Sequence, residues 1–300
     1  MLTSLTNLHR SVVRSVLGGL TAVSFAALPV AAAPAAVEVA PRTETVADSH
    51  SAQIDALFAA LGMPEMLQIL QEEGLVYGDD LANQMLPNGT GPVWQALVAD
   101  LHDPDALHAL MRSGFEESFG DADVTPLLAF YNSEAGQRIV ELELSARRAF
   151  MDEEVEEAAR ARFRNIAVPY NDHLGAIEAF VEENDLVEMN VAGAFNSNFM
   201  FMRGLVQGGA FEMSEGDILA DIWSQEAETR ADSHEWVYAF LSMAYQPLSA
   251  AEIEAYVDLS RTAEGAAMNR ALFAGFDRMY GAISLSLGVA LARQLQGETL

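Results

Sequence analysis

Residues 124–136 read Val-Thr-Pro-Leu-Leu-Ala-Phe-Tyr-Asn-Ser-Glu-Ala-Gly, and residues 253–265 read Ile-Glu-Ala-Tyr-Val-Asp-Leu-Ser-Arg-Thr-Ala-Glu-Gly. Five positions of similar character recur in the two stretches: Val124 and Ile253, Leu127 and Tyr256, Phe130 and Leu259, Ser133 and Thr262, Gly136 and Gly265. In both, an apolar helical face ends, a hydroxyl side chain can cap the next helix, and a glycine lets that helix lie close to a neighbour. The pattern predicts the same tight helix–helix corner twice.

A weaker match lies upstream of each corner. Residues 54–57 (Ile-Asp-Ala-Leu) and 65–66 (Glu-Met) resemble residues 177–180 (Ile-Glu-Ala-Phe) and 188–189 (Glu-Met). The two segments of this upstream match are separated by fewer residues than the two corners are. A short insertion must therefore lie between the upstream segment and the corner in the second copy. Together they predict an internally duplicated helical unit, with copy 1 at residues 51–168 and copy 2 at residues 174–296.

The spacing of apolar residues predicts an all-α, helical bundle-like fold. Ile54, Leu57, Phe58 and Leu61 fall at i, i+3, i+4 and i+7, which builds one apolar face. Helix starts are marked by Pro64, Asp103-Pro104, Thr125-Pro126, Ser214 and Ser249. No run of β-branched residues alternates long enough to indicate a strand.

Three longer helical features are also predicted. Residues 137–168 are predicted to form a long helical stretch that ends at Pro169, with charged residues Arg148 and Asp152, and Glu156 and Arg160, at i, i+4. Residues 232–235, Asp-Ser-His-Glu, are interpreted as the start of another helix, where the helix dipole favours acidic residues. A last helix is expected from Thr262 to about Leu295.

Residues 130–137, Phe-Tyr-Asn-Ser-Glu-Ala-Gly-Gln, resemble the Phe-Tyr-x-Ser/Thr-x-x-Gly-Lys/Gln signature of an exported bacterial helical family, the domain of unknown function numbered twenty fifty-nine. The resemblance covers about 50–60 residues around each corner, and the second copy departs further, with Ser260 in place of Tyr. It implies a helical, periplasmic protein and brings no catalytic residue. The signature positions, interpreted as structural, are Phe130, Tyr131, Ser133, Gly136, Leu259, Thr262 and Gly265.

The N-terminus predicts export. Arg10 and Arg14 precede an apolar run over residues 16–33 that ends in small residues, and cleavage is expected before Ala33. Residues 1–32 are therefore predicted to be a signal peptide and residues 33–50 a flexible leader. An uncleaved anchor is the alternative. We expect a periplasmic protein.

Charge and cysteine content narrow the possible partners. The chain has 44 acidic and 16 basic residues and a formal charge of −28. Such a surface repels nucleic acid and favours cations or basic partners, although a saline habitat would also explain it. The chain has no cysteine, which removes disulfides, thiolate metal sites and thiol nucleophiles.

Few residues suggest catalysis. There is no phosphate loop, dinucleotide fingerprint or nucleophile elbow. The densest possible metal ligands are His102, Asp105 and His108, although Asp105 is also explained as an acid in the first turn of a helix. We expect no cofactor.

The C-terminal stretch is rich in small residues. Met279, Ile283, Leu287 and Leu291 alternate with residues such as Gly281 and Gly288, a composition that allows helices to approach closely. Packing within the chain is the simplest interpretation, and a homodimer interface is the alternative. The segment is too interrupted to span a bilayer.

These observations favour a non-enzymatic periplasmic binding or interaction protein, with an apolar groove between the two copies. Its partner would be an envelope protein or a small ligand. The alternative is a metal-assisted hydrolase centred on His102 and His108. The sequence identifies neither the ligand nor the oligomeric state.

Overall fold

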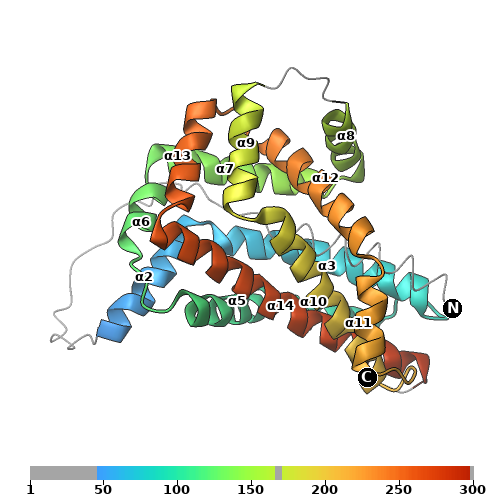
Figure 1. Ribbon diagram of the computed structural model, residues 1–300. Helices are drawn as coiled ribbons and strands as arrows, with labels where there is room; N and C mark the ends of the chain where they lie inside the picture. Colours follow the sequence, from blue (N-terminus) through green and yellow to red (C-terminus); the bar gives the residue numbers. More distant parts are fainter. Residues whose placement is uncertain (1–45, 166–170, 298–300) are drawn as a thin grey trace.

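The computed structural model describes residues 46–165 and 171–297, which form helices joined by short turns, with no strand in these two ranges (Figure 1). The all-α prediction is confirmed. The helices are α2 (Val46–Ala60), α3 (Met63–Met85), α4 (Pro92–Leu101), α5 (Pro104–Phe119), α6 (Thr125–Tyr131), α7 (Glu134–Phe150), α8 (Glu153–Arg164), α9 (Asp172–Glu183), α10 (Leu186–Gln207), α11 (Glu215–Trp223), α12 (Glu226–Ala244), α13 (Ala250–Ser260) and α14 (Ala263–Leu295).

Short polar side chains set most of the helix starts. Asp103 accepts hydrogen bonds from the backbone N–H groups of Asp105 and Ala106 at the start of α5. Ser249 and Glu252 form a reciprocal capping box at the start of α13. These bonds satisfy backbone donors that have no partner within the helix, which is why the sequence located these starts correctly.

The helical stretch predicted over residues 137–168 consists of two helices, α7 and α8. The side chain of Asp152 accepts a hydrogen bond from the backbone N–H of Glu154 and begins α8 after α7 has ended. Asp152 is therefore a cap, and Arg148 pairs instead with Glu65 of α3 at 2.7 Å. The expected pair of Glu156 and Arg160 is present at 2.7 Å.

The prediction of a helix start at residues 232–235 was also wrong. These residues lie inside α12, which begins at Glu226 after Gln225. Asp232 and Glu235 instead face the buried Arg160 of α8. We interpreted Asp232 and Glu235 as acids that a helix dipole favours. The structure shows that they instead form ion pairs with Arg160, which is distant in sequence.

The expected signal peptide lies outside the described residues, and so does most of the expected leader. Helix α2 begins at Val46, within the range expected for the leader. In the described part of the chain, no helix combines the length and apolar character that a membrane span requires.

The two halves of the chain have the same number of helices. The six helices α2 to α7 are followed, after α8, by the six helices α9 to α14. When the helices are paired in chain order, from α2 with α9 to α7 with α14, most pairs are similar in length. Helices α3 and α10 have 23 and 22 residues, and α4 and α11 have 10 and 9. The main difference is at the end, where α14 is a single helix of 33 residues and α7 stops after 17.

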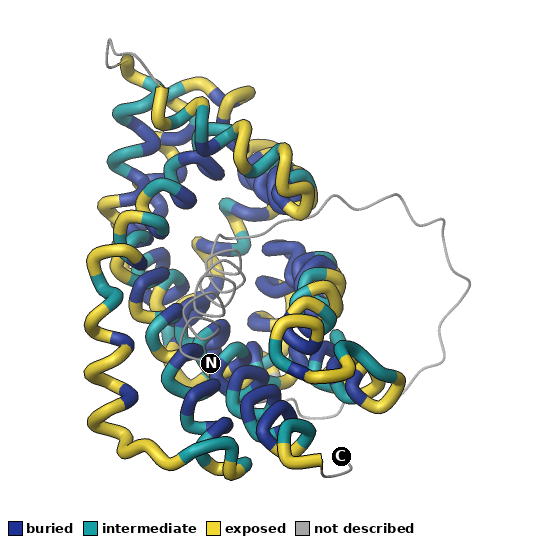
Figure 2. The backbone as a smooth tube through the Cα atoms, turned by 90° about the vertical axis from the view of Figure 1, so that its right-hand side faces the viewer, coloured by how far each residue is buried: buried dark blue, intermediate teal, exposed yellow. Residues whose placement is uncertain are grey.

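Helix α14 is the centre of the packing, between α10 and α5 (Figure 1). A Cβ atom at Gly288 would overlap the carbonyl oxygen of Phe201, and one at Gly275 would overlap Met111. The small residues of α14 therefore serve close packing within the chain. Dark blue segments in Figure 2 follow the inner faces of these helices.

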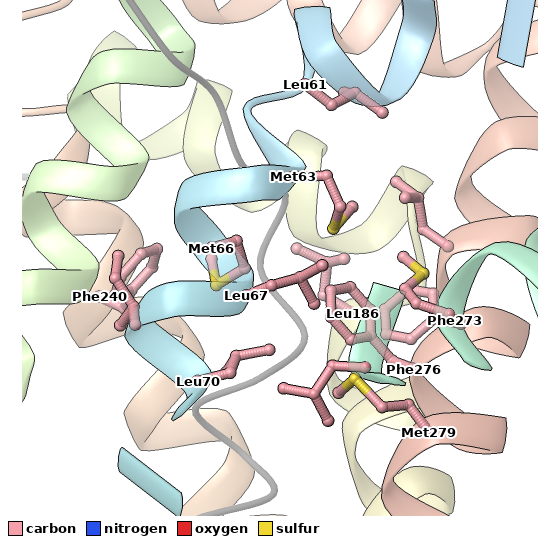
Figure 3. Packing of buried hydrophobic residues seen from close by; sticks show 14 of the residues in the cluster. Leu61, Met63, Met66, Leu67, Leu70, Leu186, Phe240, Phe273, Phe276 and Met279 are labelled. Carbon is pink, nitrogen blue, oxygen red and sulfur yellow. The ribbon is translucent and has the colours of Figure 1, made fainter. Parts of the chain in front are cut away.

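The main core joins the two halves. Met63, Leu67 and Leu70 of α3 point toward a cluster that includes Phe273, Phe276 and Met279 of α14, whereas Met66 points to the other side, toward Phe240 (Figure 3). All of these side chains are at most 5% exposed. The halves consequently share one apolar core.

Candidate functional site

Both corner motifs have the geometry that the sequence predicts. The hydroxyl of Ser133 accepts a hydrogen bond from the N–H of Gly136 at 3.1 Å, and that of Thr262 accepts one from Gly265 at 2.9 Å. A Cβ atom at either glycine would overlap the carbonyl oxygen six residues earlier in the chain, at Phe130 or Leu259. The glycines thus allow each new helix to pass directly over the end of the previous one.

The two motifs also meet each other. Phe130 stacks on Tyr256 with ring centroids 5.5 Å apart, and the hydroxyl of Tyr131 bonds that of Tyr256. Phe180 of α9 contacts the same ring of Tyr256 at 4.6 Å between centroids. Burial raises the pKa of Tyr131 and Tyr256, so both hydroxyls stay protonated, and the contact packs the two corner motifs together.

A buried acid lies close to this contact. Glu143 is 2% exposed and accepts a hydrogen bond from the hydroxyl of Tyr245. Burial raises the pKa of Glu143 well above its ordinary value, and the bond from Tyr245 opposes that rise only in part. Its second oxygen has no hydrogen-bond partner among the described residues. Glu143 also lines a cavity of about 30 Å³, which has room for water but not for an organic ligand.

The candidate metal ligands are placed separately. His102 is 5% exposed, its Nδ1 donates to the carbonyl oxygen of Val98 at 2.8 Å, and burial lowers its pKa. His108 packs edge-on against Phe58. Asp105 lies in the first turn of α5. Among the described residues, these side chains belong to no group of three or more His, Asp or Glu that could hold a metal ion.

A narrow slot lies between the two halves. Its volume is about 40 Å³, and apolar side chains of α3, α10 and α14 form most of its walls. Its polar lining includes Glu73, which pairs with the buried Arg147, and Tyr280, whose hydroxyl has no partner within residues 46–165 and 171–297. The slot is apolar and lies between the expected copies, but its size suits water molecules rather than a larger ligand.

The larger opening is a groove between α10 and α14, with a volume of about 370 Å³. We refer to it as the α10/α14 groove. It lies within the second half of the chain rather than between the halves. Its lining residues are Met189, Ala192, Gly193, Asn196, Ser197, Arg270, Phe273, Ala274, Asp277 and Tyr280.

Helical periodicity explains the α10/α14 groove. Ala192, Gly193 and Ala274 fall on the facing sides of two adjacent helices, and their short side chains leave space that larger residues would fill. Met189 and Phe273 supply apolar walls. The hydroxyl of Ser197 is buried and has no hydrogen-bond partner in the part of the chain that the structure describes.

The sequence reasoning missed this groove. It identified small residues over 279–295 but did not follow the same signal upstream to Ala274, nor to Ala192 and Gly193. The signal was available, because small residues recur at helical spacing on both segments. What the sequence could not show is that these two segments, far apart along the chain, are neighbours.

Comparison with known proteins gives one match. Residues 105–165 are similar to the family described as "Uncharacterized protein conserved in bacteria (DUF2059)". The matched segment runs through α5 to α8 and contains the first corner, so the resemblance is confirmed for that segment. No curated protein and no solved structure matches the chain.

Proposed function

We propose that this chain is an exported, non-enzymatic helical protein that binds a small, largely apolar ligand in the α10/α14 groove. The observation that carries the proposal is the groove itself. Its volume of about 370 Å³ falls within the range of about 300–1,000 Å³ that is usual for small-molecule sites. Its lining combines apolar walls with a few polar groups, as such sites do.

The test uses a substitution that fills the groove without disturbing the core. Ala192 is exposed on α10, so Ala192→Trp places an indole in the groove. Ala56→Trp is the matched control, because Ala56 is also an exposed helical alanine but lies on α2, away from the groove. Binding of the neutral dye Nile red, read by fluorescence, should weaken at least tenfold in Ala192→Trp and stay unchanged in Ala56→Trp. Equal binding by both variants would refute the proposal.

We also propose that the chain consists of two diverged copies of one helical unit. The support is that α2–α7 and α9–α14, paired in chain order, mostly have similar lengths, and that Ser133 and Thr262 cap the last helix of each set in the same way. In an experimental structure, α2–α6 should superpose on α9–α13 helix by helix. A superposition that pairs helices out of order would contradict duplication.

Export to the periplasm is part of the proposal. Its support is the apolar, small-residue N-terminal run that follows Arg10 and Arg14. Mass spectrometry of the protein recovered from the cell envelope should give an N-terminus at Ala33. An intact Met1 in the membrane fraction would favour an uncleaved anchor instead.

A second candidate function is interaction with an envelope protein through α11. Leu219 and Trp223, which are spaced i, i+4 on one face of this helix, are 44% and 63% exposed there. The same helix carries Glu215, Asp217 and Asp221 and no basic residue, so a partner with a basic, partly apolar surface would fit. Crosslinking in living cells should yield one stoichiometric partner, and Trp223→Ala should abolish its recovery.

A further inference from the structure

The way α10 is aligned along α14 determines where each polar group lies along the groove. Asn196 donates a hydrogen bond to Asp277 at 2.8 Å, and farther along Gly204 lies against Gly288. Both residue numbers rise together, so the two helices run parallel. Counting back seven residues from these partners places Met189 and Arg270 together at one end of the α10/α14 groove. Ser197 lies at the other end, near Tyr280.

Arg270 is an available cation. It is exposed at the groove, and no carboxylate within the described residues forms an ion pair with it. Most other arginines in the described ranges are paired, for example Arg261 with Glu183 at 3.0 Å and Arg230 with Glu226 at 2.5 Å. In a chain with 44 acidic residues, a groove-lining arginine without a carboxylate partner is free to bind a ligand anion.

Asp277, the other charged group of the groove, is held by the amide of Asn196, so its position is fixed by the fold. Because its partner Asn196 precedes Ser197, Asp277 lies toward the Ser197 end of the groove, seven residues along α14 from Arg270. This separation leaves the end at Arg270 as the place where a negative charge is favoured.

Ser197 is the second, independent observation. It is 1% exposed, it lines the groove, and its hydroxyl has no partner in the structure. A buried hydroxyl without a hydrogen bond is costly, so a ligand group that bonds it gains affinity. With a helix rise of about 1.5 Å per residue, Ser197 lies roughly 10–12 Å along the groove from the level of Arg270.

From these positions we infer that the ligand is an elongated monoanionic amphiphile. Its carboxylate or similar anion binds Arg270, its apolar body lies on Met189 and Phe273, and a hydrogen-bonding group at its far end meets Ser197. This inference rests on the proposed function, because it assigns the chemical class of the ligand for the same groove.

The test compares decanoate, ω-hydroxydecanoate, decanol and decylamine on the purified mature protein, by displacement of Nile red. Arg270→Ala should weaken decanoate binding about tenfold, the effect of one charge-assisted hydrogen bond, and should leave decanol unchanged. Arg270→Lys should restore most of the affinity. Arg293→Ala is the matched control, because Arg293 is also exposed on α14 without an ion pair in the described part but does not line the groove.

Ser197→Ala gives a second readout. The wild-type protein should bind ω-hydroxydecanoate more tightly than decanoate, and Ser197→Ala should remove that difference. The inference is overturned if decylamine binds as tightly as decanoate, or if Arg270→Ala leaves decanoate affinity unchanged while Nile red still binds. In those cases the groove still binds ligands and the proposed function stands. If Nile red itself does not bind the wild-type protein, both the proposed function and this inference fail.

Discussion

The hydroxyl of Tyr131 donates a hydrogen bond to the hydroxyl of Tyr256 across 3.2 Å, although 125 residues separate the two in the chain. Both rings are fully or almost fully buried, at 0% and 3% exposed. Tyr131 belongs to the first corner motif, and Tyr256 belongs to the helix that leads into the second. The bond therefore joins the two corner motifs directly, in the interior, where each hydroxyl would otherwise lack a partner.

A double-mutant cycle measures the strength of this bond. Tyr131→Phe and Tyr256→Phe should each lower the free energy of unfolding by about 0.5–1.5 kcal/mol, since each leaves one buried hydroxyl unpaired. The double variant should lose less than the sum of the two, because it leaves neither hydroxyl behind. Urea unfolding of the four proteins gives the coupling energy. Strict additivity would show that the two hydroxyls do not interact.

Alanine at the corner glycines should be destabilising to a similar extent in both halves. Gly136→Ala and Gly265→Ala each direct a methyl group into a backbone carbonyl, so we expect a loss of about 1–3 kcal/mol from each. Thermal unfolding provides the measurement.

Gly216→Ala is the control for this pair. Gly216 lies in the first turn of α11, and the nearest atom to an added Cβ would be the Ser214 hydroxyl oxygen at 3.8 Å. Alanine there should be neutral or stabilising by up to about 1 kcal/mol. If Gly136→Ala behaved like Gly216→Ala, the close approach at the corner would not exist.

The buried Glu143 should make stability depend on pH. Because its pKa is raised in the folded protein, the folded state keeps a proton that the unfolded chain releases above about pH 4.3. The stabilising effect is fully present below that pH and is lost as the pH rises toward the folded pKa. Glu143→Gln carries no such group, so its melting temperature relative to the wild type should rise between pH 4 and pH 8.

Glu141→Gln is the matched control, because Glu141 lies two residues earlier on α7 and is exposed. Its melting temperature should follow the wild type at every pH. A difference between Glu143→Gln and the wild type that stays constant with pH would show that Glu143 does not titrate abnormally.

Arg160 should be a strong anchor of α8 against α12. It is 4% exposed and forms ion pairs with Glu156, Asp232 and Glu235 at 2.7, 2.9 and 3.2 Å. Arg160→Ala removes the cation and leaves three carboxylates facing one another, so we expect a loss of about 3–5 kcal/mol. The control is Arg162→Ala, because Arg162 is exposed and lies on the same helix two residues after Arg160. Urea unfolding of this variant should show a loss of stability below about 0.5 kcal/mol. Similar losses from both would contradict the anchoring role.

Local patterns in the sequence predicted the helices and several of their starts, because caps, prolines and apolar spacing act over a few residues. They predicted both corner motifs for the same reason, since the hydroxyl and the glycine that form each corner are three residues apart. The same reasoning failed at Asp152 and at residues 232–235. There an acid has two explanations, as a cap or as a partner of a distant arginine, and only the folded chain distinguishes them.

The sequence by itself therefore determined the fold class, the corner geometry and the absence of cysteine chemistry, all of which depend on composition or on neighbours along the chain. Tertiary structure alone decided that α14 lies between α5 and α10, that Tyr131 meets Tyr256, and that Arg270 and Ser197 share one groove. It also kept His102 and His108 from joining a group of ligands among the described residues. The physical reason is that helix formation depends on hydrogen bonds and side chains within a turn or two, whereas a binding groove depends on which helices pack together. That choice is made by the whole apolar core, whose members come from both halves of the chain.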